Sequence, residues 1–176
     1  FLNISGEKFS GKTHLVNIFL KKYNGYKLDS KLLNNSSFKE IKLHQNIILE
    51  NLNENIDEIL LYTLINTIEQ DNKYLIITSQ NSIVDINFEL NDLKSRSKNF
   101  LLVNISKPDD DLVFALILKN LSDRQISLDK KLINYIINRI DRSYSKIFDF
   151  IYKIDNISLK KKKSIDLKII KDVLGE

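Results

Sequence analysis

Residues 6–13 read GEKFSGKT and follow the spacing G-x-x-x-x-G-K-[ST], which is the phosphate-binding P-loop pattern. Its glycines let the backbone curl so that N–H groups point at phosphate oxygens, and the following helix presents its positive N-terminal end to the same anion. Lys12 is predicted to reach the β- and γ-phosphates, and the Thr13 hydroxyl to bind Mg²⁺. The alternative is an ordinary glycine turn before a helix. The candidate nucleotide-binding residues are Gly6, Glu7, Lys8, Phe9, Ser10, Gly11, Lys12, Thr13 and the adjoining His14.

A carboxylate ends the apolar run NIILE at residues 46–50, where a magnesium–nucleotide site needs an acid. We expect Glu50 to orient the water shell of Mg²⁺ together with Thr13, although a strand-end carboxylate that faces solvent gives the same pattern. The next residue is Asn51, and an amide orients water but accepts protons poorly at neutral pH. The sequence therefore favours binding of ATP or ADP, with weak or no autonomous hydrolysis.

Apolar runs alternate with helical patterns through the first part of the chain. This alternation predicts an α/β fold with a five-stranded parallel sheet, in which the P-loop joins the first strand to the first helix. Gly25 is expected to end that first helix. Strands are predicted at residues 1–5, 26–30, 46–51, 73–80 and 100–106, and helices at 12–25 and 55–72.

The pattern changes at Pro108, the only proline. Four helical segments follow without a further strand, and Ser127 and Ser164 are expected to cap two of them. We therefore expect an α/β nucleotide-binding core over residues 1–107 and a small all-α lid over residues 108–176. The helices are predicted at 109–125, 127–140, 142–157 and 164–174.

The composition is that of a soluble globular protein. Hydrophobic residues make up 43% and charged residues 28%, and the net charge is +4, which permits nucleic-acid binding without requiring it. Cysteine is absent, so disulfides and thiol chemistry are excluded and a cytoplasmic location is expected. We expect no membrane span and no signal peptide. The chain starts at Phe1 rather than Met, and we expect that a natural N-terminal segment is missing.

The order of these segments resembles the DnaA family of AAA+ proteins along the whole chain. GKTHL resembles the P-loop of that family, YLIITSQ its fourth strand with a sensor position, and LNDLKSRS the segment with its arginine finger. The helices from residue 127 onward resemble its lid. DnaA initiators continue into a helix-turn-helix domain, whereas this chain stops at Glu176. It is therefore most similar to the shorter Hda-type proteins that inactivate DnaA.

The resemblance implies roles for residues outside the P-loop. Arg96 would be an arginine finger that enters the nucleotide site of a partner and stabilises the charge of the transition state. A solvated basic patch with Lys94 and Lys98 is the alternative. Ser79 and Gln80 would occupy the first sensor.

In the lid, Lys146 aligns with the second-sensor arginine of the family. This is a departure, because lysine keeps the charge but loses the bidentate fork. Arg142 lies on the same predicted helical face and is an alternative. The pair formed by Glu50 and Asn51 also departs from the two acids of DnaA, a loss that a regulator lending an arginine to a partner would tolerate.

The resemblance thus implies a nucleotide-binding regulator of replication initiation, with DnaA as its partner and Mg²⁺ and ATP or ADP as cofactors. Family members also bind the sliding clamp through a short N-terminal motif, which would precede Phe1, and a homo-oligomer is a further expectation. Direct DNA binding is not expected, because the lysine run at 159–164 is interpreted as a solvated loop. The alternatives are a DnaA initiator fragment without its DNA-binding domain and a self-sufficient P-loop ATPase.

Overall fold

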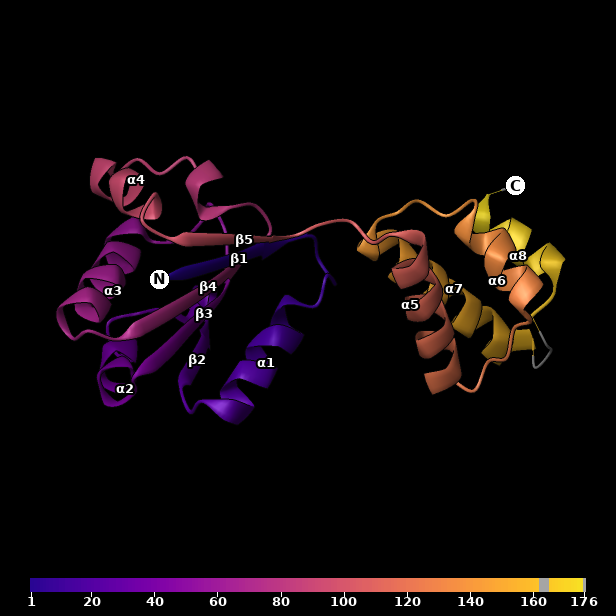
Figure 1. Ribbon diagram of the computed structural model, residues 1–176, viewed down its shortest axis with the longest axis horizontal. Coiled ribbons are helices and arrows are strands. Elements are labelled where there is room, and N and C mark those ends of the chain that lie inside the picture. Colours follow the sequence, from indigo (N-terminus) through magenta and orange to yellow (C-terminus); the bar gives the residue numbers. More distant parts are fainter. Residues whose placement is uncertain (162–164, 176) are drawn as a thin grey trace. The chain divides into compact units, whose positions relative to one another are not determined.

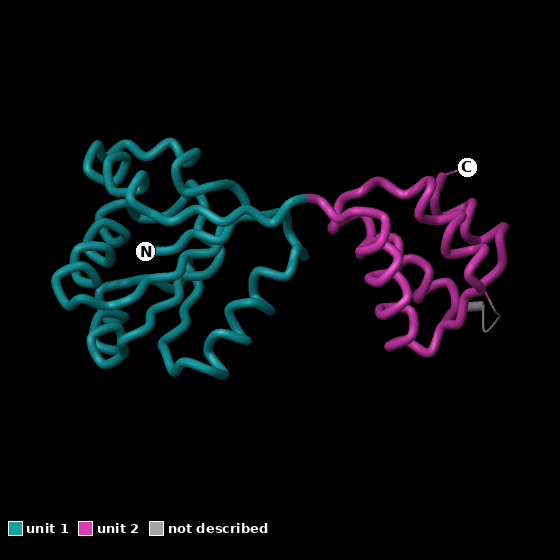
Figure 2. The backbone as a smooth tube through the Cα atoms, viewed as in Figure 1, with its two compact units in different colours: residues 1–106 teal, residues 107–176 magenta. Residues whose placement is uncertain are grey.

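The structure is a computed structural model that describes residues 1–161 and 165–175. The chain forms two compact units, Phe1–Ser106 and Lys107–Glu176, which Figure 2 shows in different colours. Each unit has a hydrophobic core of its own. Within the described residues, no helix is long and apolar enough to cross a membrane.

The first unit is built on a parallel sheet. Its strands are β1 (Leu2–Gly6), β2 (Tyr26–Asp29), β3 (Asn46–Leu52), β4 (Tyr74–Ser79) and β5 (Leu101–Ile105). They lie in the order β2-β3-β4-β1-β5, and every neighbouring pair is parallel (Figure 1). The predicted five-stranded parallel sheet is thus confirmed. Because β1 lies inside the sheet, the loop that follows it opens at the carboxyl edge of the strands, where ligands of such folds bind.

Helices cover the two faces of this sheet unequally. Helix α1 packs on one face, and α2, α3 and α4 belong to the other (Figure 1). Right-handed crossovers require this division, because only the connection from β1 to β2 runs in the opposite direction across the sheet. The helices are α1 (Lys12–Lys22), α2 (Ser37–Leu43), α3 (Glu58–Gln70) and α4 (Asn91–Ser97), with short 3₁₀ turns at Ser30–Leu32 and Ile83–Asp85.

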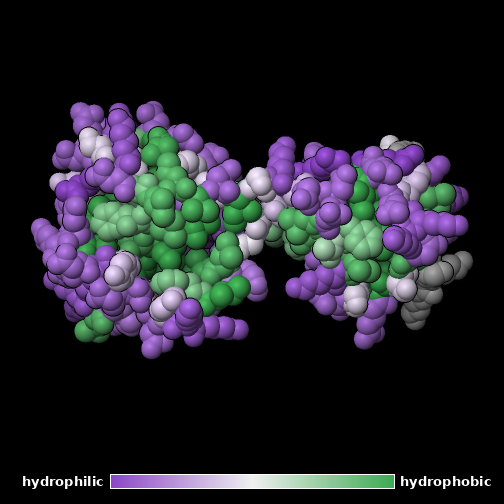
Figure 3. All heavy atoms as spheres, in the orientation of Figure 1, coloured by the Kyte–Doolittle hydropathy of each residue, from purple (hydrophilic) through white to green (hydrophobic). Residues whose placement is uncertain are grey.

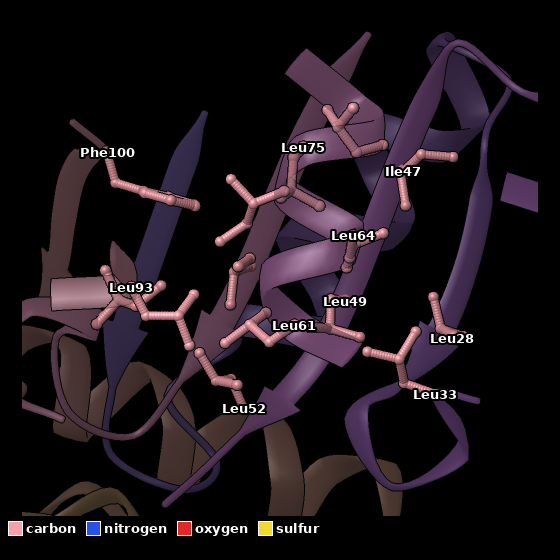
Figure 4. Close-up of a cluster of buried hydrophobic side chains, with 14 of the residues drawn as sticks. Leu28, Leu33, Ile47, Leu49, Leu52, Leu61, Leu64, Leu75, Leu93 and Phe100 are labelled. Carbon is pink, nitrogen blue, oxygen red and sulfur yellow. The ribbon is translucent and has the colours of Figure 1, made fainter. Parts of the chain in front are cut away.

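The larger core of the first unit lies between the sheet and α3. Leu61 and Leu64 of α3 meet Ile47 and Leu49 of β3 there, as Figure 4 shows. The other face has a smaller core, in which Val16 of α1 packs on the sheet. Apolar side chains remain exposed beside that smaller core, among them Tyr74, Leu101 and Val103. Figure 3 shows a broad apolar area on the surface of the first unit.

Gly25 does not end α1 as predicted. The helix stops at Lys22, and its C-cap is Tyr23 in an extended conformation. Gly25 is needed for a different reason, since a Cβ at this position would lie 2.5 Å from the backbone oxygen of Asn46. The glycine therefore permits a close approach between the turn before β2 and the start of β3.

The described residues of the second unit form helices and no strand. Asp109, Asp129 and Asp166 each cap a helix with a carboxylate that accepts a backbone N–H bond. The predicted cap at Ser127 is wrong, because Asp129 lies directly before the first helical residue, and Ser164 lies outside the described residues. The helices are α5 (Asp110–Asp123), α6 (Lys130–Ile137), α7 (Tyr144–Lys161) and α8 (Leu167–Leu174).

One core holds the second unit together. It draws apolar side chains from all four helices, including Ile117, Ile136, Ile151 and Ile170. The lysine run predicted as a loop at 159–164 begins inside α7, which continues to Lys161. Residues 162–164 lie outside the described part of the chain.

Candidate nucleotide-binding site

Two glycines shape the loop between β1 and α1, each for a different reason. A Cβ on Gly6 would lie 2.9 Å from Ser10 Oγ and 3.0 Å from Ile105 Cβ, so a larger residue would displace its neighbours. Gly11 has a φ of 95°, in the left-handed region that glycine adopts at little cost. Close packing fixes one end of the predicted P-loop, and backbone conformation fixes the other.

Lys12 is the first residue of α1 and folds back onto the loop. Its Nζ donates hydrogen bonds to the backbone oxygens of Gly6 (2.6 Å) and Glu7 (2.8 Å). Burial lowers the pKa of Lys12, and the Glu7 carboxylate opposes that shift. A phosphate oxygen carries a full charge where these carbonyls carry a partial one, so it would be the stronger partner for the same ammonium group.

The loop forms one wall of a pocket of about 580 Å³, a volume within the range of small-molecule sites, which is about 300–1,000 Å³. Residues 8–13 line it together with residues 51–55 after Glu50 and residues 79–81 at the end of β4. The structure thus brings the P-loop, Asn51 and the predicted first sensor together. Glu50 and Arg96 are not among the lining residues.

Glu50 and Asn51 have different surroundings at the end of β3. Glu50 is 8% exposed, and its Oε2 lies 3.3 Å from Lys27 Nζ. The register between β3 and β4 shifts between Leu49 and Leu52, which is a bulge of the kind that redirects a side chain next to a site. Asn51 has a left-handed φ of 61° there and is exposed in the pocket wall.

Glu50 keeps one carboxylate oxygen for a further partner. Its Oε1 is buried and makes no hydrogen bond within the described residues, and a buried acceptor without a partner needs an explanation. Mg²⁺ is a hard cation that prefers oxygen ligands, and the waters bound to it donate hydrogen bonds, so either would satisfy such an atom. The unpartnered Oε1 is thus open to a role in holding magnesium, but Lys27 competes for the same carboxylate and Glu50 does not line the pocket.

The predicted first sensor consists of one buried and one exposed residue. Ser79 is 1% exposed; its hydroxyl donates to the backbone oxygen of Asn81 (2.6 Å) and accepts from Asn3 Nδ2 (2.9 Å). Gln80 is exposed in the pocket wall, and its backbone oxygen accepts from the Gly6 N–H (3.1 Å). Gln80 is thus the residue placed to reach a ligand, while Ser79 shapes the backbone.

Asn3 supports the pocket-lining Ser79 and could not be predicted from the sequence, because a lone amide inside an apolar strand gives no spacing signal. It is fully buried. Its Nδ2 also donates to the backbone oxygen of Ile77 (3.2 Å), and its Oδ1 accepts from the Ile83 N–H (2.9 Å). Asn3 therefore ties β1 to β4 and to the turn after the first sensor.

We expect Asn3→Ala to lower the free energy of unfolding by about 1–3 kcal/mol, because it leaves buried polar groups without partners. Urea denaturation of the whole chain measures this loss. Ser5→Ala on the same strand is the matched control, and a smaller loss is expected because the Ser5 hydroxyl makes longer bonds, 3.4 Å to the Val103 backbone oxygen and 3.2 Å to Asn104 Oδ1. Equal losses in the two variants would contradict the role given to Asn3.

Arg96 lies on α4 and is engaged within the first unit. Its guanidinium forms an ion pair with Glu69 of α3 and lies 5.4 Å from the centroid of the Tyr62 ring. The hydrogen bond to Glu69 raises the pKa of Arg96. The side chain is 29% exposed, whereas Lys94 and Lys98 on either side of it are exposed residues. Arg96 is thus a paired arginine that remains partly accessible.

The predicted lid residues belong to the second unit. Lys146 lies in the first turn of α7 and is exposed. Arg142, the alternative to it, has an acidic partner of its own, since its Nη2 lies 2.8 Å from Asp110 Oδ1. The pairing favours Lys146 over Arg142 as the cation that is left for a ligand.

The structural comparisons show which known structures share this fold. The fold matches domain III of the replication initiation protein DnaA from Thermotoga maritima with a TM-score of 0.79 and 18% identity, covering 99% of this chain and 82% of that one. AMPPCP-bound DnaA from Aquifex aeolicus matches with a TM-score of 0.69 and 20% identity, over 97% and 59%. The T. maritima RuvB Holliday junction branch migration motor matches with a TM-score of 0.71 and 13% identity, over 99% and 60%. The chain therefore has the fold of these DnaA and RuvB structures.

The sequence comparisons find similarity to DnaA initiators and to the Hda lid domain. Residues 109–174 match the family described as the Hda lid domain. The chromosomal replication initiator protein DnaA of Thermoanaerobacter sp. strain X514 is 25% identical over 94% of this chain, and an uncharacterised Haemophilus influenzae protein is 23% identical over 99% of this chain and 81% of its own length. The chain is thus similar to DnaA initiators along most of its length and to the Hda lid domain over residues 109–174. It spans 43% of the length of the Thermoanaerobacter DnaA and 31% of that of the Borreliella burgdorferi strain B31 DnaA.

Proposed function

We propose that this chain is a nucleotide-binding regulator of replication initiation that promotes ATP hydrolysis by a DnaA initiator. The proposal is carried by an Hda-type lid match over residues 109–174 in a chain whose pocket presents an amide, Asn51, where hydrolysis would need an acid. An amide orients water but accepts protons poorly. Such a pocket is suited to hold a nucleotide while the chemistry takes place on a partner.

In this proposal, residues 6–13 hold the phosphates of ATP or ADP. Lys12 would exchange its two backbone carbonyl partners for phosphate oxygens, and the loop N–H groups would bind the same anion. Bound Mg²⁺ would neutralise phosphate charge, with Thr13 and Glu50 as its proposed protein partners. His14 is a proposed further contact. The AMPPCP bound to Aquifex aeolicus DnaA supports an adenine nucleotide as the ligand.

Arg96 is proposed to act on the partner rather than on the nucleotide of its own pocket. In phosphoryl transfer, charge spreads over the phosphate oxygens, and a guanidinium supplied by a neighbouring subunit stabilises it. Arg96 is partly exposed and already pairs with a carboxylate, that of Glu69. If Arg96 entered a partner's site, it would therefore exchange the Glu69 carboxylate for the phosphate oxygens of the partner's nucleotide.

The ion pair with Glu69 is expected to compete with the binding of Arg96 to a partner's nucleotide. The pair is partly solvated, with 57% of the Glu69 side chain exposed, and such pairs contribute about 0.2–1 kcal/mol. Glu69→Ala should therefore change the free energy of unfolding by less than about 1 kcal/mol. It should lower the concentration of this protein that gives half-maximal stimulation of the DnaA ATPase by about 1.4–5-fold, because the finger is released.

Glu40→Ala on α2 is the matched control, since it removes the same charge from an exposed residue away from α4. Its stimulation curve should coincide with that of the wild type. A Glu69→Ala curve that does not shift, or that shifts to higher concentration, would contradict the restraint by Glu69.

The function is tested by measuring phosphate release from ATP-bound DnaA while the wild-type chain is added. We expect release to increase with concentration and to saturate as the complex forms. Release that stays at the level of DnaA alone would refute the proposed regulation. If this chain alone released phosphate at an appreciable rate, a self-sufficient P-loop ATPase would explain the site better.

A second candidate is part of a DnaA initiator, because 94% of the chain aligns with initiators and covers less than half of their length. The coding sequence that follows the codon for Glu176 distinguishes the two. A helix-turn-helix domain encoded there would favour the initiator.

A further inference from the structure

Asn51 is exposed, yet hydrogen bonds to neighbouring elements hold its backbone in place. Its N–H donates to Thr78 Oγ1 (3.1 Å) on β4, and its backbone oxygen accepts from Ser30 Oγ (2.9 Å). Its left-handed backbone is one that asparagine and aspartate adopt more readily than most residues. The bulge in β3 therefore directs the Asn51 side chain to the pocket.

The side chain of Asn51 is fixed as well. Its Nδ2 donates to Asp29 Oδ2 (2.6 Å) at the end of β2, while Asp29 Oδ1 accepts from the Lys31 N–H (3.0 Å). A carboxylate can only accept hydrogen bonds, so the nitrogen end of the amide must face Asp29. The acceptor Oδ1 is then the end of the amide that remains for a ligand in the pocket that Asn51 lines.

This contact also explains why an acid at position 51 would not fit here. A second carboxylate at hydrogen-bond distance from Asp29 would meet a like charge, which disfavours ionisation of both. An amide is accommodated, and it has almost the shape of an aspartate. Asp29 is therefore compatible with a pocket that binds nucleotide, and it disfavours an ionised catalytic acid at position 51.

We propose that Asp29 is a positioning residue that orients the Asn51 amide beside the P-loop and restricts the pocket to nucleotide binding, so that exchanging the two side chains produces an ATPase. The inference rests on the proposed nucleotide site. In Asp29→Asn/Asn51→Asp, the hydrogen bond forms with reversed polarity and the carboxylate lies at position 51. That carboxylate takes a proton from a water whose oxygen bonds to the γ-phosphorus, the bond from that phosphorus to the bridging oxygen breaks, and ADP and phosphate leave.

The test compares the wild type with Asp29→Asn, Asn51→Asp and the exchanged pair, which keeps the wild-type composition and charge. Binding of a fluorescent ADP analogue gives the Kd, and single-turnover hydrolysis at saturating ATP and Mg²⁺ gives the rate. We expect the exchanged pair to hydrolyse about 10²–10⁴-fold faster than the wild type, the usual contribution of a positioned base. Each single variant should stay below a tenth of that rate, and the Kd shows whether each variant still binds nucleotide.

Three results would overturn the inference. In the first, the exchanged pair binds nucleotide like the wild type but gains no hydrolysis. In the second, Asn51→Asp alone is as fast as the exchanged pair, which would mean that Asp29 does not position the side chain at residue 51. In the third, the wild type binds no ADP analogue, which refutes the nucleotide site and the inference with it. The first two leave the proposed binding function intact.

A measurement on the wild-type chain keeps the inference testable if the exchanged pair does not fold. The side-chain amide protons of Asn51 are expected to give resolved NMR signals that exchange slowly with solvent. In Asp29→Ala those signals should exchange at least about tenfold faster, since a lost hydrogen bond of about 1.5 kcal/mol corresponds to that factor. Unchanged exchange would mean that Asp29 does not hold the amide.

Discussion

Lys12→Ala is expected to weaken nucleotide binding by about 10²–10⁴-fold, because two hydrogen bonds between the ammonium group and phosphate oxygens are lost at about 1.5–3 kcal/mol each. The unliganded protein loses only the bonds from Nζ to the backbone oxygens of Gly6 and Glu7. The loss should therefore appear in the affinity rather than in the fold. Titration with a fluorescent ADP analogue gives the Kd, and circular dichroism reports the fold.

Lys21→Ala is the control for the loss of charge, since Lys21 is exposed in the last turn of the same helix. Its Kd should stay within about twofold of the wild-type value, because surface charges away from a site are largely screened by salt. If Lys12→Ala bound nucleotide as tightly as Lys21→Ala, the P-loop would not be the phosphate site.

Arg96→Ala is expected to abolish the stimulation of the DnaA ATPase. Arginine fingers supplied by a partner contribute about 10³–10⁵ in kcat, so even partial dependence on Arg96 gives a large effect. Nucleotide binding by this chain should not change, because Arg96 does not line the pocket. Arg96→Lys should restore little of the stimulation, since an ammonium group cannot form the bidentate contact.

Lys98→Ala tests whether the effect belongs to Arg96 or to basic charge on that surface. Lys98 directly follows α4 and is exposed. Full stimulation by Lys98→Ala, with none by Arg96→Ala, is the expected pattern. Equal losses in both variants would favour a basic patch that attracts the partner by charge alone.

The strands could be predicted from the sequence because buried parallel strands are continuous apolar runs. The run at residues 46–51 appears as β3 (Asn46–Leu52), and β5 lies within its predicted range. Helices α2 and α4 were not predicted as helices, since each is a single short segment of seven residues. Helices of that length depend on packing more than on their own sequence pattern.

The candidate site could be predicted only where its residues are close in sequence. Residues 6–13 form a loop that a spacing rule describes. The pairs of Asp29 with Asn51 and of Glu69 with Arg96 join residues from different elements. Such contacts follow from strand order, from the bulge in β3 and from helix packing, and a single sequence displays none of these.

We propose that the nucleotide hydrolysed is the one bound to the partner, and a single-turnover assay on loaded DnaA measures this. DnaA is loaded with γ-labelled ATP, free label is removed, and this chain is added with excess unlabelled ADP. We expect rapid release of labelled phosphate with the wild-type chain, and release at the rate of DnaA alone with Arg96→Ala. Equal release with both chains, or no acceleration by the wild type, would contradict this proposal.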